Sequence, residues 1–402
     1  MSESANGISS TDRIKVTLSD IARNISENEY KPKEKGLDHC VGLEHLDPGS
    51  LKIRRWLLIT PEMSFTRRFY KGQILFGKRR AYQKKVGLAD FDGICSSDIL
   101  VIEAKKDNFV PELLPFIIQD DRFFEYAVGT SSGSLSPRTK WRFLADYEIW
   151  LPSIEEQRRI ATMLWAAEDC IEKAERFVAT AERTKQILML EFFSGRKTTR
   201  TKDWKNVKFS KIVASYKNGI YKTPEFYGSG LPSIRMFNIV EGKINKINAP
   251  LLEVTDDELK EYQLLEGDIL INRVNSIDLV GKAGIVAQDL GNVTYESKNI
   301  RVRVNQELII PEFLIFYLQT KEYSRHIRRK NKSAIGQATV NQTDLADLDI
   351  PLPTLPEQRQ IAAILTRCDE TIAAARANVV AAKGLKMKMI NEMLSPERSN
   401  GS

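Results

Sequence analysis

The sequence predicts an α+β protein made of two tandem α/β domains, each followed by a long helix. The two helices are expected to pair as an antiparallel coiled coil with pseudo-two-fold symmetry. Three observations predict this fold. The fourteen residues from Leu151 recur from Leu352, a separation of 201 residues in a chain of 402. Each copy opens a heptad-like apolar pattern, and short β-rich runs with short helical segments precede each copy.

Each copy of the repeated segment carries the signature of a helix start. Ser153 with Glu156, and Thr354 with Glu357, match the S/T-x-x-E capping box that satisfies free backbone amides. A proline directly before each cap excludes helix immediately upstream. Two helices are therefore expected to begin at these points.

Beyond each cap, apolar residues recur at alternating steps of four and three, as in a coiled coil. One lysine interrupts the pattern at the same place in both copies, Lys185 and Lys386. The first helix leads into the second domain and the second helix leaves that domain, so paired helices must run antiparallel. The expected helix-pairing residues are Ile160, Leu164, Ala167, Ile171, Ala174, Val178, Ala181, Ile361, Leu365, Cys368, Ile372, Ala375, Val379 and Ala382.

These features divide the chain into five parts. A first domain spans 1–152 and a first helix spans 153–196. A second domain spans 197–352 and a second helix spans 353–396, and a tail of 397–402 is expected to be disordered.

The two domains resemble each other faintly, as diverged copies should. Gly72–Leu75 matches Gly267–Leu270, and Val110–Glu112 matches Ile310–Glu312. The segments between these matches differ. A shared frame with different loops is the pattern expected of one scaffold that reads two different targets.

Within this frame we expect β-rich runs at Ile94–Ile102, Gly267–Asn272 and Asn299–Val304, bounded by turn-forming residues. Helical segments are expected at Glu112–Phe124 and Glu312–Arg329.

Basic and amide side chains gather in the segments that differ between the domains. Arginine and lysine suit guanine edges and phosphates, glutamine and asparagine suit adenine, and tyrosine stacks or binds phosphate. A solvated charged loop is the competing interpretation. The candidate DNA-binding residues are Lys78, Arg79, Arg80, Tyr82, Gln83, Lys84, Lys85, Lys217, Lys222, Arg235, Asn238, Arg273, Asn275 and Lys282.

Composition narrows the class of protein. The apolar content of 42% and charged content of 28% are typical of a globular chain, and a net charge of +7 favours a polyanionic partner. The chain has no run of about 18 apolar residues and no signal-peptide pattern, so we expect a cytoplasmic protein without membrane contact. Scattered cysteines and only three histidines predict no metal site.

The sequence lacks familiar catalytic motifs, although one short pattern resembles a nuclease site. The sequence has no Walker loop, G-x-S-x-G, H-E-x-x-H or N/D-P-P-Y/F motif, so no catalytic residue is expected. Asp92, Glu103 and Lys105 imitate the carboxylates and lysine of a magnesium-dependent nuclease. The pattern is short and common, and the counterpart run Asn299–Val304 has no acidic residue. An ordinary strand end is the favoured interpretation, with a nuclease as the alternative.

The paired segments Leu151–Leu164 and Leu352–Leu365, together with Gly267–Leu270 and Lys78–Tyr82, resemble the specificity subunit of type I restriction–modification enzymes. The resemblance covers nearly the whole chain. It implies a non-catalytic subunit with two target-recognition domains, each reading one half of an asymmetric bipartite site in double-stranded DNA. The paired helices would set the spacer and dock the methyltransferase subunits.

The resemblance also implies partners and cofactors. Two methyltransferase (M) subunits would bind this chain, and restriction and translocase (R) subunits would join through the complex. S-adenosylmethionine, ATP and magnesium would be held by those partners, with no cofactor in this chain. Besides the nuclease, two alternatives remain. One is a coiled-coil scaffold, and the other is the specificity chain of a fused methylase–nuclease of type II-like organisation.

Overall fold

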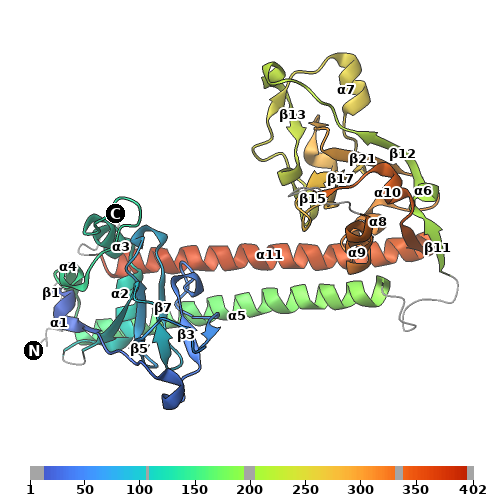
Figure 1. The fold of residues 1–402 in the computed structure, drawn as a ribbon. Helices are drawn as coiled ribbons and strands as arrows, with labels where there is room; N and C mark the ends of the chain where they lie inside the picture. The colour runs from blue at the N-terminus through green and yellow to red at the C-terminus, as the bar shows by residue number, and fades with distance from the viewer. Residues whose placement is uncertain (1–12, 106–107, 194–203, 331–337, 396–402) are drawn as a thin grey trace, which may run out of the picture. The chain divides into compact units, whose positions relative to one another are not determined.

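The protein divides into two compact units. A computed structural model describes residues 13–105, 108–193, 204–330 and 338–395. The first unit comprises Met1–Phe177 with Ala375–Ser402, and the second comprises Val178–Ala374. Each unit therefore contains one α/β domain and parts of both long helices, α5 (Ile154–Phe193) and α11 (Leu355–Met393) (Figure 1). The tail predicted at 397–402 lies outside the described residues.

The first unit is built on an antiparallel four-stranded sheet. Its order is β2 (Ala22–Ile25), β9 (Ile99–Ala104), β6 (Ile74–Gly77) and β7 (Val86–Leu88). A second sheet has the order β4 (Leu57–Leu58), β3 (His39–Val41), β8 (Gly93–Cys95) and β5 (Arg67–Phe69). A strand pair joins β1 (Ile14–Thr17) to β10 (Glu148–Leu151), directly before α5. The short helices are α1 (Leu18–Ile21), α2 (Leu114–Gln119), α3 (Asp121–Gly129) and α4 (Trp141–Leu144).

The second unit repeats this plan with additions. Its main sheet has the order β12 (Val213–Asn218), β21 (Asn299–Val304), β17 (Ile269–Asn272), β19 (Ala283–Ile285), β15 (Gly242–Ile244) and β14 (Ile239–Val240). Smaller sheets join β16 (Leu251–Leu252), β13 (Tyr227–Ile234) and β20 (Thr294–Tyr295), β18 (Val274–Asn275) and β22 (Ala338–Thr339), and β11 (Lys205–Lys208) and β23 (Asp349–Leu352). Its short helices are α6 (Phe209–Ile212), α7 (Asp256–Tyr262), α8 (Pro311–Tyr317), α9 (Lys321–Lys330) and α10 (Gln342–Ala346).

The two units share a frame and differ outside it. The order β2–β9–β6–β7 in the first corresponds to β12–β21–β17–β19 in the second. In both units, two short helices follow the central strand and pack in one apolar cluster with that sheet and with the long helices. Outside this frame, the second unit extends its main sheet by two strands and adds a three-stranded sheet, whereas the first unit adds a four-stranded sheet. The expectation of one frame with different loops is confirmed.

Three predicted segments need correction, because each is divided in the structure. The run Ile94–Ile102 is two strands, β8 and β9, which belong to different sheets and are separated by a turn closed by Ile99 N–H to Ser96 O at 3.0 Å. The segment Glu112–Phe124 breaks at Asp120, whose extended backbone and carboxylate cap α3. Thr320 breaks Glu312–Arg329 in the same way, since its hydroxyl accepts the Tyr323 N–H at 3.2 Å. Apolar residues continue across both breaks, so periodicity alone does not reveal them.

The long helices contact each other in antiparallel fashion. In the first unit, Glu168 of α5 pairs with Lys386 of α11 at 2.7 Å, and Glu175 pairs with Lys383 at 2.7 Å. The residue number rises along one helix as it falls along the other, so the predicted antiparallel pairing is confirmed. In the second unit Lys185 pairs with Asp369 at 2.5 Å. All fourteen residues expected in the seam are buried or partly buried.

A buried glutamine ties each long helix to its domain. The Gln157 Oε1 atom accepts the Val110 N–H at 3.0 Å, and its Nε2 donates to Pro152 O at 3.0 Å. Gln358 does the same in the second unit, since its Oε1 accepts the Ile310 N–H at 3.0 Å. Its Nε2 donates to Pro353 O and Leu308 O, both at 2.9 Å. The glutamine of the repeated segment thus satisfies backbone groups on both sides of the joint.

We expect Gln358→Leu to lower the free energy of unfolding by about 3 kcal/mol, because it leaves one N–H and two carbonyl groups without partners. Urea denaturation of the full chain measures the change. The matched control is Gln360→Leu at an exposed position of the same helix, expected to change stability by less than about 0.5 kcal/mol. Equal losses in the two variants would contradict the bridging role.

Candidate functional site

The predicted basic clusters occupy equivalent hairpins in the two units. In the first unit, Lys78–Lys85 connects β6 to β7, and the Gly77 N–H donates to Lys85 O at 3.0 Å. In the second unit, Arg273–Lys282 connects β17 to β19, and the Asn272 N–H donates to Lys282 O at 2.7 Å. The same end of the shared frame therefore carries a different loop in each unit.

The side chains of the first hairpin mostly bind groups of their own unit. The partners are Asp98 and Ser136 for Arg79, Ser136 for Arg80, Asp121 for Lys84 and the Leu43 carbonyl for Lys85, at 2.5 to 3.3 Å. Burial lowers the pKa of Lys78. Gln83 is partly buried, and Tyr82 is 55% exposed. These contacts give the loop a defined shape and leave Tyr82 as its most accessible predicted contact.

The anion that orders this loop is Asp98. It accepts hydrogen bonds from Arg79 at 3.3 Å and from Arg138 at 2.8 Å. Burial acts to raise the pKa of Asp98, but the hydrogen bonds from Arg138 and Arg79 outweigh it and lower the pKa. Arg80 and Lys84 both adopt a left-handed backbone, with φ of 54° and 51°. Several cations predicted to contact DNA therefore also hold the loop together.

Four predicted residues of the second unit lie away from the hairpin, and all have partners. Lys217 pairs with Glu261, and Lys222 pairs with Glu258 at 2.7 Å. The pKa of Glu258 is lowered chiefly by its hydrogen bond from Lys222. Arg235 lies 3.5 Å from Glu296. Asn238 is fully buried, and its amide binds the Arg235 N–H and Ile247 O at 3.0 and 2.9 Å.

The second hairpin keeps two cations available. Within the described part of the chain, neither Arg273 nor Lys282 has a carboxylate partner, and both are partly exposed. Asn275 Nδ2 donates to Asn272 Oδ1 at 2.9 Å, which fixes the loop between them. Tyr323 of α9 donates to Gly281 O at 2.7 Å and holds the loop against that helix.

Helix α9 carries a basic surface that we did not predict from the sequence. Lys321, Arg325, Arg328 and Arg329 are exposed and fall within an arc of about 100° at 100° per residue. The opposite face buries Tyr323 and Ile327. Arg325 and Arg328 reach Glu322 and Asp278, but remain 65% and 60% exposed. Helical spacing of the cations was the signal that would have revealed this stripe. The corresponding α3 begins with Asp121 and has no such stripe.

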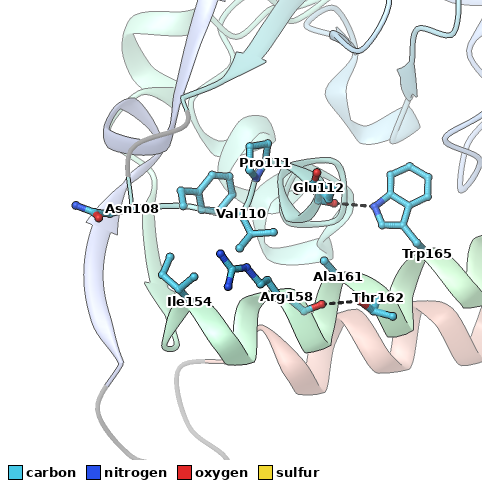
Figure 2. Close-up of a pocket in the computed structure, with 10 residues that line it drawn as sticks. Asn108, Val110, Pro111, Glu112, Ile154, Arg158, Ala161, Thr162 and Trp165 are labelled. Carbon is cyan, nitrogen blue, oxygen red and sulfur yellow. Dashed lines mark hydrogen bonds between the residues drawn. The ribbon is translucent and has the colours of Figure 1, made fainter.

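A second feature recurs in both units, a pocket where the long helix begins. In the first unit its volume is about 840 Å³, and α5 supplies Arg158, Ala161, Thr162 and Trp165. Figure 2 shows Arg158 extending from α5 toward the segment of Val110, and Trp165 Nε1 donates to Glu112 O at 3.0 Å. The second pocket, of about 450 Å³, is lined by Ile310, Glu312, Arg359, Ala362, Ala363, Thr366, Arg367 and Glu370.

These pockets share an arginine, an alanine and a glutamate at corresponding positions, and differ in the rest of their lining. Arg158 and Ala161 stand 201 residues before Arg359 and Ala362, and Glu112 corresponds to Glu312. All four charged side chains are exposed, and none has an ion-pair partner among the described residues. The two units therefore present the same exposed arginine and glutamate at this pocket, although their hairpin loops differ.

The residues of the nuclease alternative are engaged in local contacts. Glu103 binds Arg23 and accepts from Gln73 Nε2 at 3.2 Å. Lys105 Nζ donates to Ser19 O at 2.5 Å, and Asp92 accepts the Lys71 N–H at 2.9 Å. Over the described ranges, no three His, Cys, Asp or Glu side chains gather as metal ligands. These contacts agree with an ordinary strand end.

Comparison with known families decides the class of protein. The type I restriction modification DNA specificity domain matches residues 59–177 and 201–381, well over half of the chain. The chain belongs to this family. Its two matched segments correspond to the two units that share a frame, and each includes part of a long helix.

Named relatives are type I specificity subunits. The chain is 27% identical over 222 residues to the putative MjaX specificity subunit of Methanocaldococcus jannaschii, covering 52% of this chain and 51% of the relative. It is 24% identical over 224 residues to the EcoKI specificity subunit of Escherichia coli, covering 52% and 48%. The chain spans about half the length of these two relatives. The match to the M. jannaschii MjaVIII specificity subunit is longer, at 25% identity over 81% of this chain and 76% of the relative.

Solved structures share the fold. The type I restriction–modification S subunit of M. genitalium superposes with a TM-score of 0.60 at 13% identity, covering 98% of both chains. A chain from a type I R-M system solved to explain complex assembly and conformational transition gives 0.58 at 21% identity, covering 95% of this chain and 97% of that one. These likenesses confirm the predicted fold class.

Family membership decides between the competing classes. The chain is a DNA-specificity component of a restriction–modification system and does not itself perform the catalysis, as predicted. The nuclease and scaffold alternatives are therefore not favoured. Among the described helices, none combines the length and apolar character that a membrane-spanning segment requires.

We expect the double variant Arg325→Ala, Arg329→Ala to weaken binding of a random-sequence DNA duplex about tenfold. The slope of log affinity against log salt should fall by about 2, because each lost phosphate contact removes about 0.9. Filter binding across a salt titration measures both quantities. The control is Lys211→Ala, Lys260→Ala, two exposed lysines of the same unit. An unchanged salt slope in the α9 variant would exclude α9 from the DNA surface.

Proposed function

We propose that this chain is the sequence-specific DNA recognition subunit of a type I restriction–modification complex. Each unit reads one half of an asymmetric bipartite site in double-stranded DNA. The observation that carries the proposal is a common frame, β2–β9–β6–β7 and β12–β21–β17–β19, that bears different loops at the same hairpin. One scaffold with two loop sets is suited to read two different half-sites in a related orientation.

The chemistry of the two loops differs enough to support different readouts. The first loop is braced by its own ion pairs and presents Tyr82. The second presents Arg273 and Lys282, and its loop contacts α9 through the Gly281 carbonyl and Asp278. Arginine and lysine are the usual partners of guanine edges and phosphates, whereas an exposed tyrosine stacks or binds phosphate. An asymmetric target follows from this difference.

We further propose that the paired helices set the unspecified gap between the half-sites. Half-sites read from one face of B-DNA lie about one helical turn apart, roughly 34–36 Å. A helix of 40 residues such as α5 is about 60 Å long, which exceeds that separation. Helices of this length, paired along an apolar seam, are stiff enough to serve as a spacer.

The matched pockets support docking of two copies of one partner. Diverged copies of a domain have no structural reason to keep the same exposed, unpaired charges, yet both keep the arginine and glutamate of this pocket. Two methyltransferase subunits are the partners we propose for these pockets. Restriction and translocase subunits would join through that complex, and the partners would hold S-adenosylmethionine, ATP and magnesium in the cytoplasm.

The proposal predicts one asymmetric bipartite motif, with adenine methylation, in the methylome of cells that carry this chain and its methylating partner. Deleting the chain while keeping the partner should abolish methylation of that motif. Long-read sequencing of methylated DNA measures both. A continuous palindromic motif, or methylation that persists without the chain, would sink the proposal.

For the pockets, we expect either single variant, Arg158→Glu or Arg359→Glu, to reduce the bound methyltransferase subunits from two to one. The double variant should bind none, because the reversed charge repels the group that each pocket arginine recognises. Native mass spectrometry of the mixed subunits gives the stoichiometry. Arg183→Glu, at an exposed site of α5 outside both pockets, is the control. Two bound partners in the double variant would refute the docking site.

A further inference from the structure

We propose that Lys185 and Lys386 fix the register in which the long helices dock on each unit, and that they thereby specify the length of the DNA spacer. In the sequence, these two lysines interrupt the apolar seam at matching positions. The inference rests on the proposed function in one respect, the link between helix register and spacer. The role of the lysines in register is testable without DNA.

In the first unit, Lys386 is the meeting point of three elements. Its side chain is fully buried. The Nζ atom donates to Glu168 Oε2 of α5 at 2.7 Å, to Gln119 Oε1 of α2 at 3.0 Å and to Gly49 O at 3.2 Å. An ammonium group has three protons, so all of its donors have acceptors. The lysine thus holds α11 at one axial position on the domain and on α5.

The Gly49–Arg54 loop extends the same junction. The Leu51 N–H donates to Glu168 Oε1 at 3.3 Å, so Glu168 binds both the loop and Lys386. Lys52 pairs with Glu172 of α5 at 2.5 Å, and Arg54 pairs with Glu175. The acidic face of α5 therefore binds both the domain loop and α11.

In the second unit, Lys185 is the counterpart. It stands 201 residues before Lys386, and its partner Asp369 stands 201 residues after Glu168. Lys185 Nζ lies 2.5 Å from Asp369 Oδ1, with the side chain 13% exposed, and 5.3 Å from the ring centre of Phe316 in α8. Lys185 of α5 therefore contacts both α11 and helix α8 of the domain.

The apolar seam cannot define the register by itself. A slip by one heptad replaces each apolar seam position with another apolar position, because the pattern repeats every seven residues. The two seam lysines are the positions whose facing residues change in kind when the helices slip by one heptad. A slip in one direction would place Lys185 beside Arg376 instead of Asp369. A slip in the other direction would place Lys386 beside Ala161 and Lys185 beside Ala362.

Either slip therefore leaves at least one seam lysine without an acid. Burying an unpaired cation is strongly unfavourable, whereas in the observed register both lysines are neutralised. A polar residue at a seam position is a known device for specifying register in coiled coils. Here the device appears twice, once in each unit.

Each long helix has two anchors, its buried glutamine and its seam lysine. The spacing of these anchors links helix register to the length of the DNA spacer. Gln157 and Lys185 are 28 residues apart on α5, and Gln358 and Lys386 are 28 residues apart on α11, four heptads in each case. On each helix the glutamine binds one unit and the lysine binds the other. A fixed number of helical residues therefore lies between the anchors in both helices.

The first test follows the spacer in cells. We expect Lys185→Met, Lys386→Met to methylate the same two half-sites at the wild-type gap and at gaps shifted by about 3 base pairs. One heptad is about 10.5 Å of helix, and base pairs are about 3.4 Å apart. The control is Arg183→Met, Lys388→Met, exposed residues of the same helices, which should keep one gap. A single unchanged gap in the seam variant would overturn the inference.

The second test reads register in the isolated chain. Glu175→Cys with Lys383→Cys, in a background with Cys170→Ser and Cys368→Ser, should be joined readily by a short bis-maleimide, because the side chains of these residues pair in the observed register. The same two cysteines should cross-link several-fold more slowly when Lys185 and Lys386 are methionine. Equal rates would overturn the role of the lysines. A register effect without a bipartite methylated motif would instead count against the proposed function.

Charge exchange covers the case in which the methionine variant does not fold. Lys185→Asp should lower the thermal stability and slow this cross-linking, and adding Asp369→Lys should restore both by re-forming the ion pair with its ends exchanged. Recovery supports the inference. Failure of the exchanged pair to recover the cross-linking rate contradicts it.

Discussion

The buried amide at the start of each long helix is the interaction on which the rest of the structure depends. Gln157 and Gln358 each accept a backbone N–H from the segment that begins α2 or α8, and each donates to the carbonyl of the proline before the cap. Because these groups are buried, leaving them unpaired would be costly, so the helix can start at only one place on its domain. That placement brings Arg158 and Arg359 to their pockets and aligns each apolar seam with the core of its unit.

Electrostatics then separates structural cations from available ones. The first hairpin is rich in lysine and arginine, yet Asp98, Asp121 and Ser136 bind most of them. A tight loop with two left-handed residues needs such braces, because its backbone alone is unfavourable. In the second unit the braces are amides, Asn272 and Asn275, and the cations Arg273 and Lys282 remain available. A cluster of charged residues in a sequence therefore indicates a binding surface only once the intramolecular partners of those residues are known.

The internal repeat serves as a comparison within one molecule. Two kinds of polar position that kept their residues in both copies can be compared. The glutamines and seam lysines are buried, or largely buried in the case of Lys185, and hold helices to domains, whereas the pocket arginines and glutamates are exposed and without ion-pair partners in the described chain. The first kind is explained by the fold. The exposed pocket charges have no structural role within the chain, so we attribute their retention in both copies to a partner that binds both units. The hairpin loops and α9, which diverged, are the parts suited to distinguish two DNA half-sites.

The sequence by itself determined the features that arise from local physics and connectivity. Caps at Ser153 and Thr354, heptad spacing, and a repeat with one connection between its copies are sufficient to predict two long antiparallel helices on a duplicated frame. Only the tertiary structure decided which cations are available, where α2 and α8 end, and what Lys185 and Lys386 do. The reason is distance along the chain. Lys386 finds its acceptors at Gly49, Gln119 and Glu168, hundreds of residues away, and no periodicity records such contacts.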